Sequence, residues 1–277
     1  MRQFRCSSLG KITVGMSLSP LGLTDIQAKK LAELIDKGSK AKEVQELIDK
    51  RDKIPEMKLS AGAKTYIEDV WYGDYFGFQK SFHNKFVEKG NVVENGSIKA
   101  LSKYLGFFTA KNEEYLSNEF IQGTPDVRLN KPKCTIDTKN VYYPNGLEFF
   151  KATDEEKHIY QWQIHGYNFL DEKEVGFVAR ILMNPPSHIL EKEVWTYWKD
   201  SGNEGYPDDE FKKEIEQMFN FESKPIEDRV NLFRVDSKED HFAIIKKAVV
   251  LANEYYESLT EKFASRNKDE IQYFLNK

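Results

Sequence analysis

Two helical stretches follow a short N-terminal segment. In the first, "DIQAKKLAELIDKG", apolar side chains recur at mostly helical spacing, with Thr24 as a typical N-cap before it and Gly38 at its end. Ser39 then begins "KAKEVQELIDKRDK", a second helix of high charge. The pattern predicts a helical hairpin within residues 1–60.

A helical pattern also extends over the next fifty residues. Residues 62–90 are rich in aromatic side chains, which favours one or two buried helices. "GNVVENGSIKALSKYLG" continues the helical spacing. We therefore expect helices up to the point where the pattern changes, at Asn118.

From Asn118 the sequence predicts strands. "NEFIQGTPDVRLNKPKCTIDTKNVYY" has short apolar runs separated by Gly-Thr-Pro and Asn-Lys-Pro, which is typical of a strand meander with a turn at 130–133. A helix is expected from Thr153 or Asp154 to about Leu170, and "EVGFVARILM" alternates as a further strand.

From His188 onward the sequence returns to amphipathic helices, including a long final one near "HFAIIKKAVVLANEYYESLTEKFASR". Within this part, "WTYWKD" places Trp195 and Trp198 close together. The two rings either pack in a core or stack on nucleic-acid bases.

Composition limits the class of protein. The chain has 277 residues, of which 40% are hydrophobic, enough for a packed core in one domain. No apolar run of about 18 residues could span a bilayer and residues 1–20 lack a signal-peptide pattern, so we expect a cytoplasmic protein with no membrane partner. Cys6 and Cys134 are too few for a disulfide framework or a Cys-built metal site, so reduced thiols are expected.

Charge is distributed unevenly. The net charge is −4, and residues 1–60 carry 12 Lys+Arg against 8 Asp+Glu, which leaves −8 for the remainder. Phosphate contacts normally leave a basic footprint, so any DNA-binding surface must be local. Carboxylates that bind a metal would also make their own site acidic.

Two aspartates and a lysine lie on neighbouring predicted strands. Asp126 stands in "GTPDVRL", and Asp137 and Lys139 stand in "CTIDTKN". Because side chains alternate along a strand, Asp137 and Lys139 share a face, and a hairpin would bring Asp126 opposite them. Such carboxylates can hold Mg²⁺ and an ammonium can orient a water, as phosphodiester hydrolysis requires. Each motif alone is also compatible with an ordinary turn or a solvated strand face.

In this order, the motifs resemble those of the PD-(D/E)xK nuclease superfamily. The similarity is greatest to the phage-type exonucleases and the YqaJ-like viral recombinase nucleases, with kinship to RecB-type nuclease domains, and it covers about residues 1–185. Asp126 matches the PD aspartate, and Asp137 with Lys139 match the (D/E)xK element. Glu94, in "KGNVVENGSI", matches the acidic residue of the preceding helix.

Two further motifs extend the resemblance. Gln163 and Tyr167 in "YQWQIHGYNFL" match the Q-x-x-x-Y element of the RecB-like branch. "RCSSLGKI" resembles the Ser-rich opening of the phage nucleases, so Ser8 or Ser7, with Arg5 beside them, would contact a DNA phosphate.

Some family features are missing. Two cysteines cannot ligate the four-cysteine iron–sulfur cluster of certain relatives, and "LGKIT" does not match a P-loop, so a stand-alone nuclease without an ATPase is expected. His165 lies two residues after Gln163 and therefore faces another side of the helix, and we expect it and His158 to be structural.

The resemblance implies an α/β (α+β) fold. A restriction-endonuclease-like core would have a central mixed β-sheet flanked by helices, with helical additions at both ends. Residues 1–277 would form a single nuclease domain, with a helical segment over 1–60, a catalytic core over about 85–185 and a helical segment over 186–277.

The resemblance also implies a site for one or two Mg²⁺ or Mn²⁺ ions. The ligands would be three carboxylates and one backbone carbonyl: Glu94, Asp126, Asp137 and Thr138. Lys139 would position the attacking water. Gln163 would hydrogen-bond near the metal or to a phosphate, and Tyr167 would support it from one helical turn along.

The implied function is that of a metal-dependent deoxyribonuclease, an exonuclease that hydrolyses phosphodiester bonds from duplex DNA ends in phage-type recombination or DNA processing. Expected partners are DNA with a free end, a single-strand annealing protein and further copies of the chain, in the host cytoplasm if the protein is phage-encoded. Two alternatives stay open: a structure-specific or nicking endonuclease, and a non-catalytic DNA-binding protein on a nuclease fold.

Overall fold

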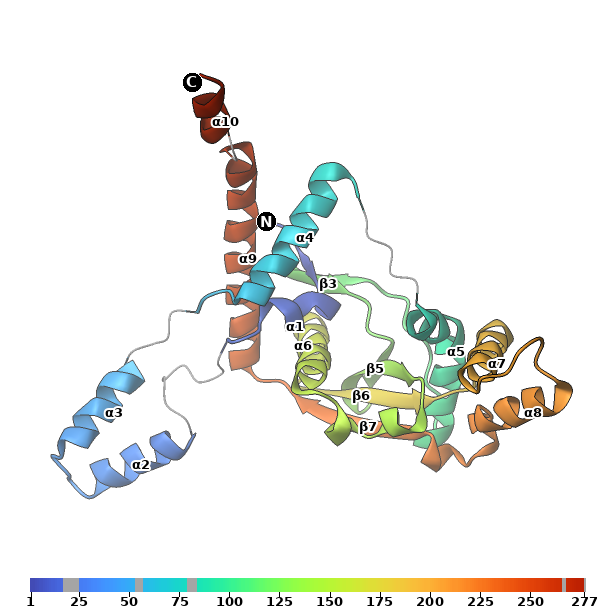
Figure 1. The fold of residues 1–277 in the computed structure, drawn as a ribbon. Coiled ribbons are helices and arrows are strands. Elements are labelled where there is room, and N and C mark those ends of the chain that lie inside the picture. The colour runs from blue at the N-terminus through green and yellow to red at the C-terminus, as the bar shows by residue number, and fades with distance from the viewer. Residues whose placement is uncertain (17–24, 53–56, 79–83, 266–267, 277) are drawn as a thin grey trace. The chain divides into compact units, whose positions relative to one another are not determined.

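A computed structural model describes residues 1–16, 25–52, 57–78, 84–265 and 268–276 (Figure 1). The helices are α1 (Leu9–Ile12), α2 (Asp25–Asp36), α3 (Lys42–Asp52), α4 (Ala61–Phe76), α5 (Lys85–Leu105), α6 (Asp154–Leu170), α7 (Ser187–Asp200), α8 (Asp209–Met218), α9 (Glu239–Ser265) and α10 (Lys268–Leu275). The strands are β1 (Phe4–Arg5), β2 (Leu116–Ser117), β3 (Ile121–Gly123), β4 (Val127–Asn130), β5 (Lys133–Val141), β6 (Val175–Leu182) and β7 (Val230–Asp236). Short 3₁₀ turns are η1 (Cys6–Ser8), η2 (Pro144–Leu147), η3 (Phe149–Lys151), η4 (Phe221–Ser223) and η5 (Ile226–Asp228).

The chain divides into two compact units. The first comprises residues 1–2, 11–71 and 239–277, and the second comprises residues 3–10 and 72–238. A single domain over the whole chain stays a prediction. All the residues expected to form the site belong to the second unit.

A mixed sheet forms the centre of the second unit. Its strand order is β4-β5-β6-β7, with β5 and β6 parallel and the two outer pairs antiparallel (Figure 1). The β4–β5 hairpin turns between Asn130 and Lys133, which are paired across it, as the sequence predicts. The mixed sheet with flanking helices confirms the predicted fold class.

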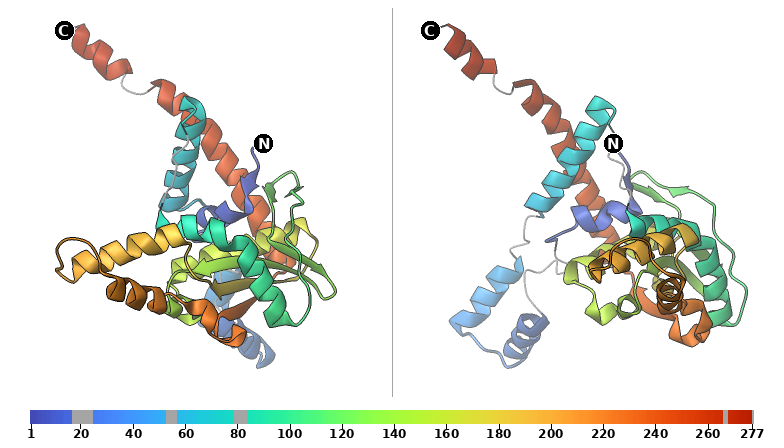
Figure 2. Two further views of the ribbon diagram at one scale, coloured as in Figure 1. Left: turned by 90° about the vertical axis from the view of Figure 1, so that its right-hand side faces the viewer. Right: turned by 45° about the vertical axis from the view of Figure 1, so that its right-hand side comes forward.

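Alternation along β5 directs its side chains to two different helices. Cys134 and Ile136 belong to an apolar cluster with Ile98 and Leu101 of α5. Thr135 points the opposite way, and its hydroxyl donates to Asn168 of α6 at 2.5 Å. The two helices therefore cover opposite faces of the sheet (Figure 2). Strand β5 presents polar side chains to α6.

Helix α6 begins where the sequence predicts. The hydroxyl of Thr153 accepts a hydrogen bond from the Glu156 backbone N–H at 3.1 Å, which is a standard N-cap. The helix ends at Leu170, and β6 follows after a short loop with most of its side chains buried. A buried apolar strand between two others is expected to read as a nearly continuous hydrophobic run, as "VGFVARIL" does.

A second, small sheet has the order β1-β3-β2. Strand β3 lies in the first apolar run of the predicted meander, whereas the sequence pattern does not predict β1 or β2. The small sheet holds η1 beside α6, where the backbones approach closely. A Cβ added at Gly166 would lie 2.5 Å from Leu9 Cδ1 and 3.0 Å from Cys6 Sγ. One added at Gly123 would lie 2.9 Å from Tyr167 Cε1. A side chain at either position would force these neighbours to shift, so glycine favours this packing of the N-terminal segment against α6.

Residues after 186 are not all helical, so that part of the prediction is wrong. Strand β7 pairs antiparallel with β6 over its full length, from Val230 opposite Ile181 to Asp236 opposite Val175. Before it, α7 and α8 lie side by side (Figure 2). The expectation of buried aromatic residues over 62–90 is also wrong in part. Trp71 is buried, but five other aromatic side chains of this segment are exposed: Tyr72, Tyr75, Phe76, Phe78 and Phe86.

In the first unit, α2 and α3 pack through Leu31, Val44 and Leu47, which confirms the helical hairpin. The expected N-cap, Thr24, lies outside the described residues. Helix α4 packs on α9, where the Trp71 and Phe263 rings lie 5.1 Å apart.

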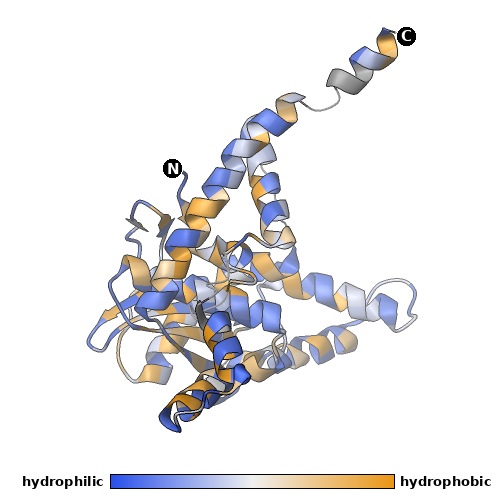
Figure 3. Cartoon of the chain, turned by 90° about the vertical axis from the view of Figure 1, so that its left-hand side faces the viewer, coloured by the Kyte–Doolittle hydropathy of each residue, from blue (hydrophilic) through white to orange (hydrophobic). Residues whose placement is uncertain are grey.

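Apolar and polar positions alternate along α9 (Figure 3). Among the described helices, none combines the length and the apolar character needed to cross a bilayer.

Candidate active site

Asp126 lies directly before β4 and reaches across to β5. Its Oδ2 accepts two hydrogen bonds from Thr138, one from the backbone N–H at 2.7 Å and one from the hydroxyl at 2.6 Å. Because β4 pairs with β5 only from Val127 opposite Ile136, the β5 backbone beyond that pair is free to bind this carboxylate. The hairpin thus brings Asp126 to Asp137, as the motif spacing predicts.

Asp137 is buried at 3% exposure and has a partner on each oxygen. Its Oδ1 accepts a hydrogen bond from Gln163 Nε2 at 3.0 Å, and its Oδ2 lies 2.5 Å from Lys139 Nζ. Asp137 and Lys139 therefore share the α6 side of β5, as strand alternation predicts.

Gln163 and Tyr167 are one helical turn apart on α6 and form a single unit. Gln163 Nε2 also donates to the Tyr167 hydroxyl at 3.0 Å, and both side chains are buried. Burial raises the pKa of Tyr167, with the charge of Asp137 adding to the effect, so the phenol stays neutral. The structure thus brings the Q-x-x-x-Y side chains to Asp137.

The two carboxylates influence each other electrostatically. Burial raises the pKa of Asp126 to about 6, and the charge of Asp137 contributes, although the hydrogen bonds from Thr138 oppose the rise. Burial alone would lower the pKa of Lys139, but the charge of Asp137 and the ion pair with it leave that pKa raised. The ammonium is thus retained beside a carboxylate pair that it only partly neutralises.

Glu94 lies on α5 and forms an ion pair with Lys111, whose Nζ is 2.8 Å from Glu94 Oε2. The hydrogen bond to Glu94 raises the pKa of Lys111, and the charge of Asp126 adds to this. In the described ranges, no three His, Cys, Asp or Glu side chains converge closely enough to hold a metal ion. The role of Glu94 as a ligand therefore stays a prediction.

The other expected ligands, two carboxylates and a backbone carbonyl, nevertheless suit a hard cation. Asp126 and Asp137 carry two negative charges against one ammonium, in a place where burial makes the charge costly. The N–H of Thr138 points to Asp126, and the C=O of a strand residue points to the same side as its N–H, so the Thr138 carbonyl faces the same carboxylate. Carboxylate and carbonyl oxygens are the ligands that Mg²⁺ and Mn²⁺ prefer.

The Ser-rich motif lies close to this site. Cys6, in η1, contacts the same Gly123 and Gly166 backbone that borders Tyr167. Ser7 and Arg5 are exposed and Ser8 is half-buried, so these side chains are accessible to a ligand. Their contact with a DNA phosphate stays a prediction.

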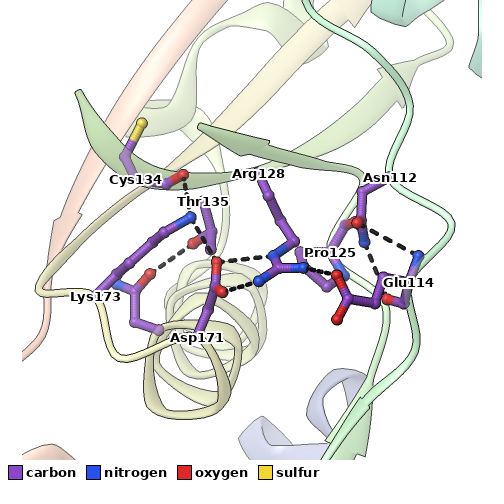
Figure 4. A network of polar contacts seen from close by, with 9 residues as sticks. Asn112, Glu114, Pro125, Arg128, Cys134, Thr135, Asp171 and Lys173 are labelled. Carbon is purple, nitrogen blue, oxygen red and sulfur yellow. Dashed lines mark hydrogen bonds and ion pairs between the residues drawn. The ribbon is translucent and has the colours of Figure 1, made fainter. Parts of the chain in front are cut away.

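A network that the sequence does not indicate holds the PD backbone in place (Figure 4). Asn112 Nδ2 donates to the Pro125 carbonyl at 2.9 Å, and the Asn112 backbone N–H donates to the Asp126 carbonyl at 2.7 Å. The peptide groups on both sides of Asp126 Cα are thus fixed by one residue. Nothing in the local sequence around "KNEEY" marks Asn112 for this task.

The same network joins β4 to the end of α6. Arg128 donates from Nε to Asp171 Oδ2 at 3.0 Å and also pairs with Glu114 (Figure 4). Lys173 Nζ lies 2.5 Å from the same Asp171 oxygen. Burial would raise the pKa of Asp171, but the bonds from Arg128 and Lys173 outweigh it and hold the pKa below its ordinary value. The helix that carries Gln163 is therefore tied to the strand that follows Asp126.

Two histidines, His158 and His165, and the two cysteines occupy structural positions. His165 Nδ1 is 2.8 Å from Ser237 Oγ, on a different side of α6 from Gln163. Burial lowers the pKa of His158. Cys6 and Cys134 are free, buried thiols, and burial raises the pKa of both. Their structural positions agree with the sequence-based expectation.

Beside the sheet, α7 and α8 enclose an open cavity of about 460 Å³. Trp195 and Tyr206 line it and meet edge to face at 5.3 Å. Trp198 packs instead against Phe211, at 5.0 Å.

Comparison with known proteins shows which solved structures have a similar fold. No protein-family model matches the sequence, and no curated protein matches it. The structure is similar to a phage-related exonuclease from Haemophilus somnus, with a TM-score of 0.65 and 24% identity over 95% of this chain and 96% of that one. It is also similar to an alkaline exonuclease from Laribacter hongkongensis, with a TM-score of 0.50 and 12% identity over 78% of this chain and 89% of that one. The chain therefore has the fold of these exonucleases, as the order of its motifs predicts.

Proposed function

We propose that the chain is a metal-dependent exonuclease that hydrolyses phosphodiester bonds of duplex DNA from a free end. The observation that carries this is the convergence of Asp126, Asp137, Lys139 and Gln163 on a nuclease fold. Fold alone does not define an activity, but these side chains supply the groups that phosphodiester hydrolysis needs.

The proposed metal ligands are Asp126, Asp137 and the Thr138 carbonyl, with Glu94 as a further carboxylate. When bound there, Mg²⁺ or Mn²⁺, as one or two ions, would polarise the phosphate and lower the pKa of a bound water. Glu94 would have to leave Lys111 to join this set.

The chain's own residues have distinct tasks in this proposal. Lys139 places a positive charge beside Asp137, where it can orient a water and stabilise negative charge that develops on the phosphate. Gln163 holds one Asp137 oxygen in place, and Tyr167 receives the second N–H of Gln163 as a neutral phenol. The two α6 side chains thereby orient a strand carboxylate.

Binding of DNA by an acidic protein requires local contacts. Ser8, Ser7 and Arg5 offer hydroxyl and guanidinium donors in the segment whose Cys6 borders Gly123 and Gly166, and we assign them to a DNA phosphate. A single-strand annealing protein, further copies of this chain and a cytoplasmic location, in the host if the protein is phage-encoded, complete the proposal.

The decisive assay compares linear with covalently closed circular duplex DNA in the presence of Mg²⁺ or Mn²⁺. Degradation of linear DNA alone, lost in Asp137→Asn and Lys139→Ala, supports the exonuclease. Cutting of closed circles would favour an endonuclease, and binding without cleavage would favour a non-catalytic protein. If both variants cut as fast as the parent, the site assignment is wrong.

A further inference from the structure

Lys139 has a second neighbour besides Asp137. Its Nζ lies 5.1 Å from the centroid of the Tyr160 ring, which is within cation–π range. Tyr160 is on α6, three residues before Gln163, so it shares the helix face that also carries Gln163 and Tyr167. The ammonium is therefore held between a carboxylate of β5 and a ring of α6.

The Tyr160 ring is itself held from the sheet. Arg180 pairs with Lys139 in the β5–β6 register, and its guanidinium carbon lies 5.7 Å from the Tyr160 centroid. Arg180 is only 4% exposed, and it donates to the Gly146 carbonyl at 2.7 Å and pairs with Glu156 at 2.5 Å. A buried, doubly anchored guanidinium is a rigid support for the ring.

The contact depends on the ring and not on the phenol hydroxyl. Among the described residues, the hydroxyl of Tyr160 makes no hydrogen bond, whereas that of Tyr167 accepts one from Gln163. The two tyrosines of α6 therefore act differently. Tyr167 supports a hydrogen-bond donor, and Tyr160 offers its ring to a cation.

We propose that Tyr160 is a positioning residue for Lys139, and that its ring, supported by Arg180, keeps the Lys139 ammonium beside Asp137. The inference deepens the proposed nuclease function, since it assigns to α6 a third side chain that orders the active site. Neither the Asp-x-Lys nor the Q-x-x-x-Y spacing includes Tyr160 or Arg180.

The first test measures how accessible Lys139 is to a labelling reagent, and it needs neither enzymatic activity nor a bound metal. Parent, Tyr160→Phe, Tyr160→Leu and Tyr160→Met proteins are trace-labelled with acetic anhydride in EDTA, and acetylation of Lys139 is compared by peptide mass spectrometry with that of exposed lysines. Loss of the ring is expected to raise Lys139 labelling at least threefold in the Leu and Met variants. The Phe variant is expected to stay within 1.5-fold of the parent.

The second test uses steady-state kinetics on an end-labelled linear duplex. Tyr160→Leu and Tyr160→Met are expected to lower kcat about tenfold with KM unchanged, because the ring contacts Lys139 and the DNA-phosphate contacts are assigned to Arg5, Ser7 and Ser8, whereas Tyr160→Phe restores kcat to within twofold. Trp162→Leu is the matched control. It also removes an α6 aromatic, but the Trp162 ring packs on His158 and His165, so Lys139 labelling should not change.

The outcomes separate the two proposals. Equal Lys139 labelling in parent and ring-less variants, or a Tyr160→Phe variant that labels like Tyr160→Leu, would overturn the positioning role. A rise in labelling after Trp162→Leu as large as that after Tyr160→Leu would also overturn it, since the effect would then be general loosening of α6. If labelling behaves as expected but the parent leaves DNA intact, the nuclease proposal fails while the position of Lys139 stands.

Discussion

Gln163 on α6 donates a hydrogen bond to Asp137 on β5 at 3.0 Å. One oxygen of a buried strand carboxylate is thus oriented by a helix side chain, while the other oxygen faces Lys139. Because Asp171, at the end of α6, binds Arg128 on β4, the same helix helps to position both Asp137 and Asp126.

Removal of the Gln163 amide should impair catalysis more than folding. Gln163→Ala is expected to lower kcat by about 10- to 100-fold, because Asp137 loses the donor that orients it. Gln163→Glu should be at least as slow, since it places a further carboxylate beside Asp137. Initial rates on end-labelled linear DNA, with melting temperatures as the folding control, measure both. A Gln163→Ala rate equal to that of the parent would contradict the orienting role.

Asp126 should make stability depend on pH. Its pKa is about 6 in the folded protein against an ordinary 3.8, so the folded state binds this proton more tightly than the unfolded state. The resulting stabilisation is at most about 3 kcal/mol. It is fully present below about pH 4 and is lost as the pH rises through 6. Urea unfolding in EDTA measures it.

The control for this pH effect is Asp126→Asn, which cannot ionise. Its free energy of unfolding relative to the parent should therefore increase between pH 4 and pH 7.5. A difference that is the same at both pH values would contradict the raised pKa of Asp126.

Divalent cations should stabilise the protein through the two aspartates. At a concentration 100 times the Kd, Mn²⁺ or Mg²⁺ should add about 2.7 kcal/mol to the free energy of unfolding. Asp126→Asn and Asp137→Asn should lose this gain. Melting temperatures measured across a cation titration test it, with Ca²⁺-free EDTA buffer as the reference. An unchanged cation response in both variants would exclude these carboxylates as ligands.

Glu94 has two possible roles, and a pair of variants distinguishes them. If Glu94 binds the cation, Glu94→Gln should reduce the cation-induced rise in melting temperature, whereas Lys111→Ala should preserve or increase it by freeing the carboxylate. If Glu94 only pairs with Lys111, the two variants should behave alike. The melting temperature with and without Mn²⁺ is the measurement.

A methyl group at Gly166 should disturb the packing of η1 on α6. The added Cβ would lie 2.5 Å from Leu9 Cδ1, so Gly166→Ala is expected to cost about 1–3 kcal/mol. Gly90→Ala in α5 is the matched control, because a Cβ there meets nothing within 4 Å and should stabilise by about 0.5–1 kcal/mol. Equal stabilities by urea unfolding would contradict the close approach.

Local sequence was sufficient for the part of the site that lies on one hairpin and one helix. The β4–β5 hairpin follows from the Pro-punctuated apolar runs around Asp126, and α6 follows from its cap at Thr153. Strand alternation then places Asp137 and Lys139 together, and helical spacing places Gln163 near Tyr167. These are short-range relationships, so their geometry is contained in the spacing.

The contacts that the sequence did not reveal join distant segments. Strand β1 has only two residues and exists through pairing with Ile121, far along the chain, so it has no periodicity of its own. Strand β7 is an edge strand with mixed exposure, so its alternation is difficult to distinguish from the helical patterns on either side of it. Asn112 and Arg180 meet their targets only after the sheet has formed, because no fixed spacing relates them to Asp126 or Lys139.

The division of β5 between two faces also determines where the hairpin can vary in length. A residue inserted in β5 between Cys134 and Asp137 would turn every later side chain of the strand to the opposite face of the sheet. The Asp137 carboxylate and the Lys139 ammonium would then point into the apolar layer on α5. The same insertion at the 131–132 turn would leave the phase between β5 and β6 intact. Relatives of this chain are therefore expected to differ in length at the hairpin turn. The number of residues from the beginning of β5 to Lys139 is expected to stay constant.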